Sequence, residues 1–128
     1  VAAAGNAGAR ARPPYPAAYE TAVAVTAVST SLRIYRRASQ EPHVDFAAPG
    51  VDLRIPAATR RTDRRTGTSF AAPFVSAAIA VLRQAQPDAS VAEVVGQFAA
   101  SARDLGAPGK DPVFGWGLIQ ASCPQAPQ

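Results

Sequence analysis

The sequence contains no methionine, one cysteine and one histidine. With Cys123 as its only cysteine, the chain can form neither an internal disulfide nor a cysteine-based zinc site, and we expect no metal and no cofactor. No apolar run reaches the roughly 18 residues that cross a bilayer, so we expect no membrane partner. No charged stretch leads into an apolar one, so no signal peptide is expected within these residues.

The sequence has fewer acidic than basic residues. Its nine acidic and 13 basic residues give a net charge of +4. A basic chain of this kind could bind nucleic acid or an anionic surface. Its arginines, however, lie in polar stretches that offer no series of aromatic residues on which bases could stack, since only Tyr35 is interleaved with them. We therefore interpret them as a solvated face carried by loops, and expect no nucleic-acid partner. The excess is concentrated at Arg33, Arg36, Arg37, Arg60, Arg61, Arg64 and Arg65.

Three short apolar runs are separated by polar segments. Residues 1–4, 22–28 and 44–48 consist of small and β-branched residues without alternation, which is typical of buried parallel strands. The polar, arginine-rich residues 51–67 are expected to form a mobile loop or a hairpin at the rim of any active site. The first half of the chain is therefore predicted to be built on strands.

The second half is predicted to be helical. Residues 69–86 are apolar around most of their circumference, which indicates a helix that lies inside a larger fold. Ser90 and Glu93 form a capping box at the start of a second, amphipathic helix that ends near Ala102. The 128 residues suit a single domain, in which residues 122–128 are expected to be a frayed tail.

The junction between the two halves has the most distinctive chemistry, in the sequence Thr-Gly-Thr-Ser-Phe-Ala-Ala-Pro at residues 66–73. Gly67 permits a tight turn before Ser69, and a serine at a helix N-terminus lies beside free N–H groups that stabilise negative charge. Pro73 is expected in the first turn, where its missing N–H costs little. From Gly-Thr-Ser alone, a threonine or serine N-cap without any chemistry is the favoured interpretation.

The longer pattern resembles the subtilisin-like serine peptidases. Residues 66–75 are similar to the nucleophile segment of that family, with Phe74 where the family most often has histidine. Other segments resemble the family in the same order along the chain. They are Ala3-Ala4-Gly5-Asn6, the "YPA-x-Y" and valine-rich strand at residues 15–28, the "VD-x-AAPGV" strand at residues 44–51, and the closing segment at residues 114–119.

This resemblance covers the chain nearly end to end, but only about the latter half of the family's fold. It implies an α/β fold with a mainly parallel sheet flanked by helices, which is incomplete without an upstream half. The opening residues 1–4 are similar to the end of a strand, so we expect the chain to be part of a longer protein.

The resemblance also assigns roles to individual residues. It implies that Ser69 is the nucleophile and that Asn6 donates its amide N–H to the oxyanion. Considered alone, Asn6 is explained as a turn residue. A pocket for the substrate side chain before the scissile bond is implied at Ala3, Ala4, Gly5, Pro14 and Tyr15, with Pro14 standing where the family often has glycine.

The one histidine is not assigned as the catalytic base. A serine hydroxyl needs a neighbouring base and a carboxylate that orients it, which makes His43 with Asp45 or Asp52 a tempting choice. In the family, however, the aspartate and the histidine both precede the asparagine segment. We therefore interpret His43 as a surface residue and expect both partners of Ser69 upstream of this chain.

The implied function is hydrolysis of peptide or protein substrates through an acyl-enzyme, with the upstream half as a partner and with secretion or a cell-envelope location. On this hypothesis the chain alone is inactive, because its serine has no base. The alternative is a non-catalytic interaction module derived from a peptidase half, which would self-associate through an exposed sheet edge. A third interpretation is nucleic-acid binding through the arginine loops.

Overall fold

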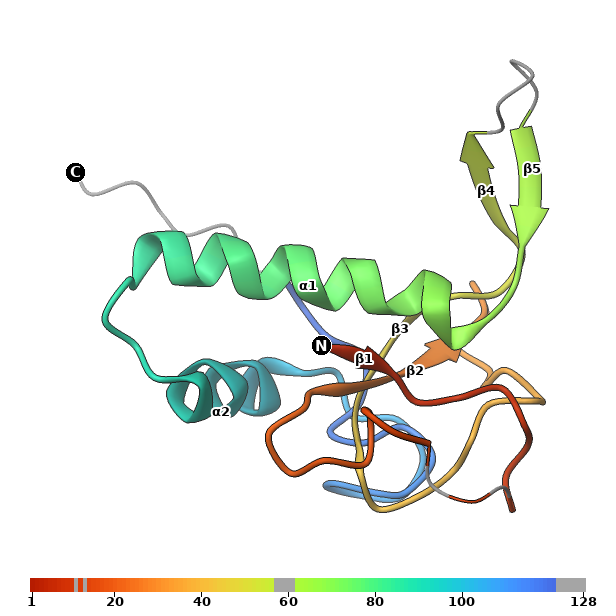
Figure 1. Ribbon diagram of the computed structural model, residues 1–128, viewed down its shortest axis with the longest axis horizontal. Coiled ribbons are helices and arrows are strands. Elements are labelled where there is room, and N and C mark those ends of the chain that lie inside the picture. The colour runs from red at the N-terminus through yellow and green to blue at the C-terminus, as the bar shows by residue number, and fades with distance from the viewer. Residues whose placement is uncertain (11, 13, 57–61, 122–128) are drawn as a thin grey trace.

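The computed structural model describes residues 1–10, 12, 14–56 and 62–121, and it has the expected α/β architecture. A parallel sheet of three strands, β1 (Ala2–Ala3), β2 (Ala24–Val28) and β3 (Val44–Pro49), lies beneath the long helix α1 (Thr68–Ala85) (Figure 1). The predictions for Cys123, for Arg60 and Arg61, and for the tail at residues 122–128 lie outside the described residues.

The sheet has the order β1-β2-β3, so β2 is central. All five residues of β2 are buried, which agrees with its unbroken apolar sequence. The outer edge of β3 is covered by the segment at residues 117–119. The N–H of Ala47 donates to the carbonyl of Gly117 at 2.8 Å, and the carbonyl of Ala47 accepts from the N–H of Ile119 at 3.0 Å. Strand β1, only two residues long, is the open edge of the sheet within the described part of the chain.

Helix α1 packs one face on the sheet and leaves the other face open. Ala71, Val75 and Ala78, spaced by four and three residues, are buried against β2 and β3. On the open face Phe74 is 46% exposed and Val81 is 45% exposed. The helix is therefore only half-buried by this chain, although its apolar sequence predicts an interior position.

Pro73 lies inside α1 and not in its first turn, so that prediction was wrong. The helix begins at Thr68, which makes Pro73 its sixth residue. A proline there has no N–H to donate to the carbonyl four residues earlier, which belongs to Ser69. The carbonyl of the candidate nucleophile thus lacks its usual helical hydrogen bond.

The arginine-rich stretch forms a hairpin, one of the two structures expected for it. Strands β4 (Leu53–Pro56) and β5 (Thr62–Arg65) are antiparallel and project from the rest of the molecule (Figure 1). Arg64 pairs with Asp52, and Arg65 pairs with Asp63 at 2.6 Å. The hairpin therefore neutralises two of its own arginines.

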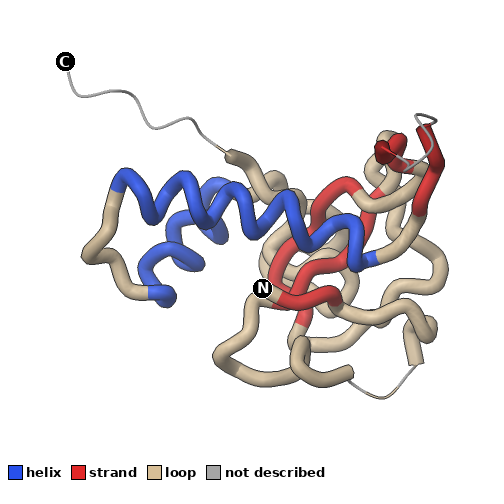
Figure 2. Tube along the Cα trace, turned by 45° about the horizontal axis from the view of Figure 1, so that its top comes forward, coloured by secondary structure: helices blue, strands red, loops and turns tan. Residues whose placement is uncertain are grey.

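Helix α2 (Val91–Ser101) begins with the predicted capping box and packs beside α1 (Figure 2). The Ser90 hydroxyl accepts from the N–H of Glu93 at 3.2 Å, and the Glu93 carboxylate accepts from the N–H of Ser90 at 2.7 Å. Hydrogen bonds from the Ser90 side chain and then from its backbone hold the pKa of Glu93 below its usual value.

This lowered pKa predicts an acid-dependent loss of stability. Because the folded-state pKa of Glu93 lies below the unfolded-state value, its contribution is fully present above the unfolded-state pKa and is lost as the pH falls through the folded-state pKa. We expect Glu93→Gln to lower the free energy of unfolding at about pH 7 and to lower it much less at about pH 3. Urea titrations at both values test this, and an equal difference at both would contradict it.

Candidate active site

Gly5 and Asn6 are joined to Thr68, the first residue of α1, by three hydrogen bonds, although Asn6 and Thr68 are 62 residues apart in the sequence. The Asn6 Oδ1 atom accepts from the N–H of Thr68 at 2.9 Å and from its hydroxyl at 3.1 Å. The same hydroxyl accepts from the N–H of Gly5 at 3.2 Å. Thr68 is fully buried, so these bonds fix the turn after β1 against the first residue of the helix.

The orientation of the Asn6 amide follows from these partners. A backbone N–H can only donate, so the atom that faces the N–H of Thr68 is the oxygen, and Nδ2 is left on the other side. Within the described residues Nδ2 donates to no protein atom. A Cβ placed on Gly67 would lie 3.7 Å from Nδ2, so the amide lies against the residue that precedes the helix.

Ser69 is exposed in the first turn of α1, one residue after Thr68. The N-cap is Gly67 and no side chain caps the helix, so the interpretation of Ser69 as a plain cap has no support here. In the part of the chain that the structure describes, the N–H of Ser69 has no acceptor. A free backbone donor and an exposed hydroxyl, both of Ser69, therefore lie in the first turn of the helix, and the amide of Asn6 is held against the same turn.

The ends of the strands hold the helix start in place. The N–H of Gly67 donates to the carbonyl of Gly50 at 2.9 Å, and the N–H of Gly50 donates to the carbonyl of Val28 at 3.0 Å. Gly50 follows β3 and Val28 ends β2, so the carboxyl ends of the strands meet the N-terminus of α1 (Figure 1).

Gly50 has no room for a side chain at this junction. A Cβ there would lie 2.5 Å from the Cβ of Ala27 and 2.9 Å from the carbonyl oxygen of Gly67. We expect Gly50→Ala to lower the free energy of unfolding by about 1–3 kcal/mol, as overpacking does. At Gly96, within α2, an added Cβ meets nothing within 4 Å, so Gly96→Ala is expected to stabilise the fold by about 0.5–1 kcal/mol. Urea midpoints of both variants test the contrast, and equal shifts would contradict it.

Four of the five predicted pocket residues are at least partly exposed and can contact a substrate. Ala3 and Gly5 are half-buried, and the Cγ of Pro14 would be 2.9 Å from a Cβ on Gly5, so Pro14 lies directly beside that wall. Tyr15 is 69% exposed, and its ring lies 4.7 Å from that of Tyr19. Ala4 is fully buried, so its side chain can only support the wall from beneath.

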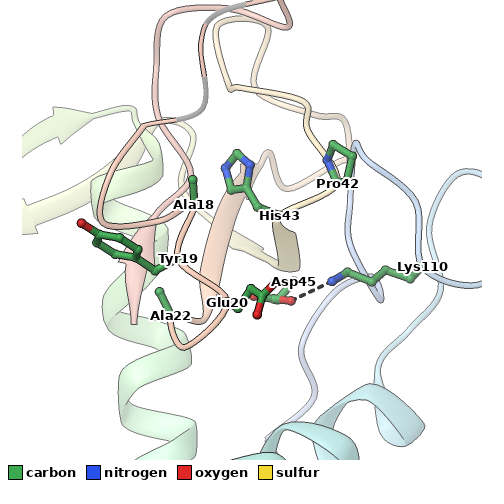
Figure 3. Close-up of a pocket in the computed structure, with 8 residues that line it drawn as sticks. All are labelled: Ala18, Tyr19, Glu20, Ala22, Pro42, His43, Asp45 and Lys110. Atoms are coloured by element: carbon green, nitrogen blue, oxygen red, sulfur yellow. Dashed lines mark hydrogen bonds and ion pairs between the residues drawn. The ribbon is translucent and has the colours of Figure 1, made fainter.

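His43 and Asp45 lie at the other end of the sheet. His43 precedes β3, whereas Gly50 follows it, and at about 3.3 Å per residue the strand separates them by roughly 20 Å. The Asp45 carboxylate is turned to Lys110, at 2.9 Å, and its other oxygen accepts from the N–H of Ala24 (Figure 3). This arrangement gives no support to a Ser69–His43 pair.

The pocket around His43 was not foreseen. It has a volume of about 280 Å³ and lies between the segment before β2, the start of β3 and Lys110 (Figure 3). His43 is half-buried, not the surface residue expected, and its enclosed Nε2 has no partner among the described residues. No sequence signal pairs Lys110 with Asp45, because 65 residues separate them.

The described ranges offer neither a metal site nor a membrane span. No group of three or more histidine, cysteine, aspartate or glutamate side chains is placed to hold a metal ion there. In the same ranges, neither helix combines the length and apolarity that a bilayer span requires.

Comparisons with known proteins identify the family and the fold. Residues 1–117 match the Peptidase S8 family model, described as the subtilase family. The minor extracellular protease Epr of Bacillus subtilis is 34% identical over 120 residues, which cover 94% of this chain and 19% of that protein. The major intracellular serine protease of the same species is 35% identical over 69 residues, which cover 54% of this chain and 22% of that protein.

A solved structure shows the same fold. Fervidolysin from Fervidobacterium pennivorans, a keratinolytic enzyme related to subtilisin, superposes with a TM-score of 0.80 at 26% identity, over 96% of this chain and 22% of its own. The matched regions therefore cover about a fifth of the length of each of these three proteins.

Proposed function

The chain belongs to the subtilase family, and from that premise we propose that the complete protein is a serine endopeptidase whose nucleophile is Ser69. The observation that carries the proposal is the junction of Asn6 with the start of α1. There an exposed hydroxyl lies beside two donors, the N–H of Ser69 and the Nδ2 of Asn6, that have no acceptor in the described part of the chain.

In the proposed reaction the Ser69 Oγ attacks the carbonyl carbon of the scissile peptide bond. A histidine oriented by an aspartate, both supplied by an upstream half, takes the serine proton and passes it to the leaving amine. The carbonyl oxygen becomes an oxyanion that accepts from the N–H of Ser69 and the Nδ2 of Asn6. Water then hydrolyses the acyl-enzyme by the same proton transfers in reverse.

The site gains support from features around it. The dipole of α1 favours an anion at its N-terminus, where Ser69 lies. Residues Ala3, Gly5, Pro14 and Tyr15 are proposed to border the pocket for the side chain that precedes the scissile bond, with Ala4 beneath them. Small residues along that wall leave room for a large apolar side chain.

The upstream half is proposed to cover the open face of α1. Its exposed Phe74 and Val81 favour an apolar partner, and the extracellular relative is about five times longer than its matched region. A secreted or cell-envelope location is part of the proposal; the extracellular relative supports it and the intracellular relative does not. The same open face would also suit self-association, the alternative function.

Labelling with an activated fluorophosphonate tests the proposal. We expect stoichiometric labelling of Ser69 in the full-length protein, none in its Ser69→Ala variant, and unchanged labelling in Ser76→Ala, which removes another exposed serine of α1. The 128-residue chain alone should remain unlabelled, because the base is missing. An unlabelled full-length protein that forms stable dimers would instead favour the interaction module.

A further inference from the structure

A basic groove adjoins the candidate active site. It has a volume of about 450 Å³, and its apolar lining residues are Ile34, Tyr35 and Val51. Two arginines, Arg33 and Arg36, also line it and are exposed. The groove thus combines a surface for an aliphatic stem with two cationic donors.

Backbone hydrogen bonds place this groove next to the start of α1. Two of its lining residues, Ser29 and Val51, directly follow Val28 and Gly50, which are bonded to each other. Gly50 is bonded in turn to Gly67. At about 4.8 Å for each such step, the groove begins within roughly 10 Å of the helix start. That distance equals about three residues of an extended peptide.

The loop that carries the arginines is rigidly attached to the same framework. The N–H of Tyr35 donates to the carbonyl of Ala27 at 2.8 Å, and the N–H of Gly8 donates to the carbonyl of Arg37 at 2.9 Å. The N–H of Ser39, which is buried, donates to the carbonyl of Gly5 at 3.0 Å. Both ends of the loop are therefore anchored beside residues of the site, which limits the entropy lost when a ligand binds.

Charge pairing separates these arginines from those of the hairpin. Arg64 and Arg65 each have an aspartate partner. Among the described residues neither Arg33 nor Arg36 has a carboxylate within ion-pair distance. The two groove arginines are thus available to a carboxylate from another molecule, and guanidinium groups bind carboxylates in a bidentate fork.

We infer that this groove binds an acidic side chain of the peptide substrate, two or three residues after the scissile bond. The pocket proposed for the residue before that bond lies at the end of β1. The groove lies at the ends of β2 and β3, farther along the sheet from that pocket. Glutamate suits the groove best, because its methylene groups can contact the apolar lining residues while its carboxylate reaches Arg33 and Arg36. The inference rests on the proposed peptidase function.

Nucleic acid suits the groove less well. A strand of phosphates would need a continuous basic track or stacked aromatic faces. This groove offers only two arginines, and its one aromatic residue, Tyr35, is partly buried in the core. A single carboxylate matches the size and the charge of the site.

Cleavage of a matched peptide series by the full-length protein tests the inference. The peptides differ only at the third residue after the scissile bond, which is glutamate, glutamine or lysine. We expect kcat/KM for glutamate to exceed that for glutamine by about three- to tenfold, the size expected of two exposed charge pairs, and to fall with added salt. The preference should vanish in Arg33→Gln/Arg36→Gln and persist in Arg83→Gln, which removes the same kind of charge near the other end of α1.

The outcomes separate this inference from the proposed function. Equal cleavage of the glutamate and glutamine peptides, or a preference that survives in the double variant, would overturn the inference and leave the peptidase intact. Binding of the same peptides to the Ser69→Ala protein, measured by fluorescence anisotropy, gives a second readout. If the peptides bind with charge selectivity but the unmodified full-length protein cleaves none of them, the peptidase proposal fails and the groove remains. Displacement of the glutamate peptide by a DNA oligonucleotide with a steep salt dependence would overturn the inference.

Discussion

Replacing Ser69 with alanine in the full-length protein is expected to lower kcat by about 10⁶-fold, a magnitude taken from removal of the nucleophile in subtilisin itself. The reason is that the Oγ is the only atom of Ser69 that forms a covalent bond with the substrate. KM should change little, because the backbone N–H of Ser69 and the amide of Asn6 remain. Steady-state kinetics on a chromogenic peptide, with active sites counted by burst titration, measure the effect.

Ser76→Ala is the matched control for this variant, since it removes an exposed serine from the same helix without touching the junction. It should keep the activity of the unmodified protein. The Thr68 network contains no atom of the Ser69 side chain, so Ser69→Ala should also keep its melting temperature. A loss of less than about tenfold would show that another residue is the nucleophile.

Asn6→Asp is expected to lower kcat by at least about 10²–10³-fold, the range known from removal of the equivalent donor in subtilisin, from which we adopt it. Aspartate retains an oxygen that can accept from the N–H and the hydroxyl of Thr68. It replaces the Nδ2 donor by a negative charge facing the oxyanion. The fold should therefore persist while the transition state loses a donor and gains a repulsive neighbour.

Asn6→Ala separates the two roles of this side chain. It removes the donor as Asn6→Asp does, but it also leaves the buried Thr68 without its acceptor. We expect a similar loss in kcat together with about 1–3 kcal/mol of lost stability, the cost of an unsatisfied buried group. Equal kcat in the unmodified protein and both variants would show that Asn6 has only a structural role.

Local patterns predicted the regular elements well. The expected helix over residues 69–86 is α1, Thr68–Ala85, and the capping box at Ser90 and Glu93 opens α2. Both predictions succeeded because helix periodicity and capping depend on residues that are near each other in the sequence. Strand β3 also matches its predicted run, since buried parallel strands are marked by unbroken apolar residues.

Predictions failed where the outcome depended on distant contacts. Pro73 was placed in the first turn, but α1 begins at Thr68, where Gly67 and Thr68 are bonded to Gly50 and Asn6, so Pro73 is its sixth residue. The role of Thr68 as the bridge between Asn6 and α1 has no local signal. The resemblance named Asn6 and Ser69 as partners, whereas only the fold shows which atoms of Asn6 are occupied and which remain free.

The most direct test of the account is a crystal structure of the full-length protein with a peptide boronic acid bound. We predict a covalent bond from the Ser69 Oγ to boron, with one boronate oxygen 2.7–3.1 Å, or about hydrogen-bond length, from both the Asn6 Nδ2 and the N–H of Ser69. A boronate attached to another residue, or an Asn6 amide turned away from the bound oxygen, would contradict the account.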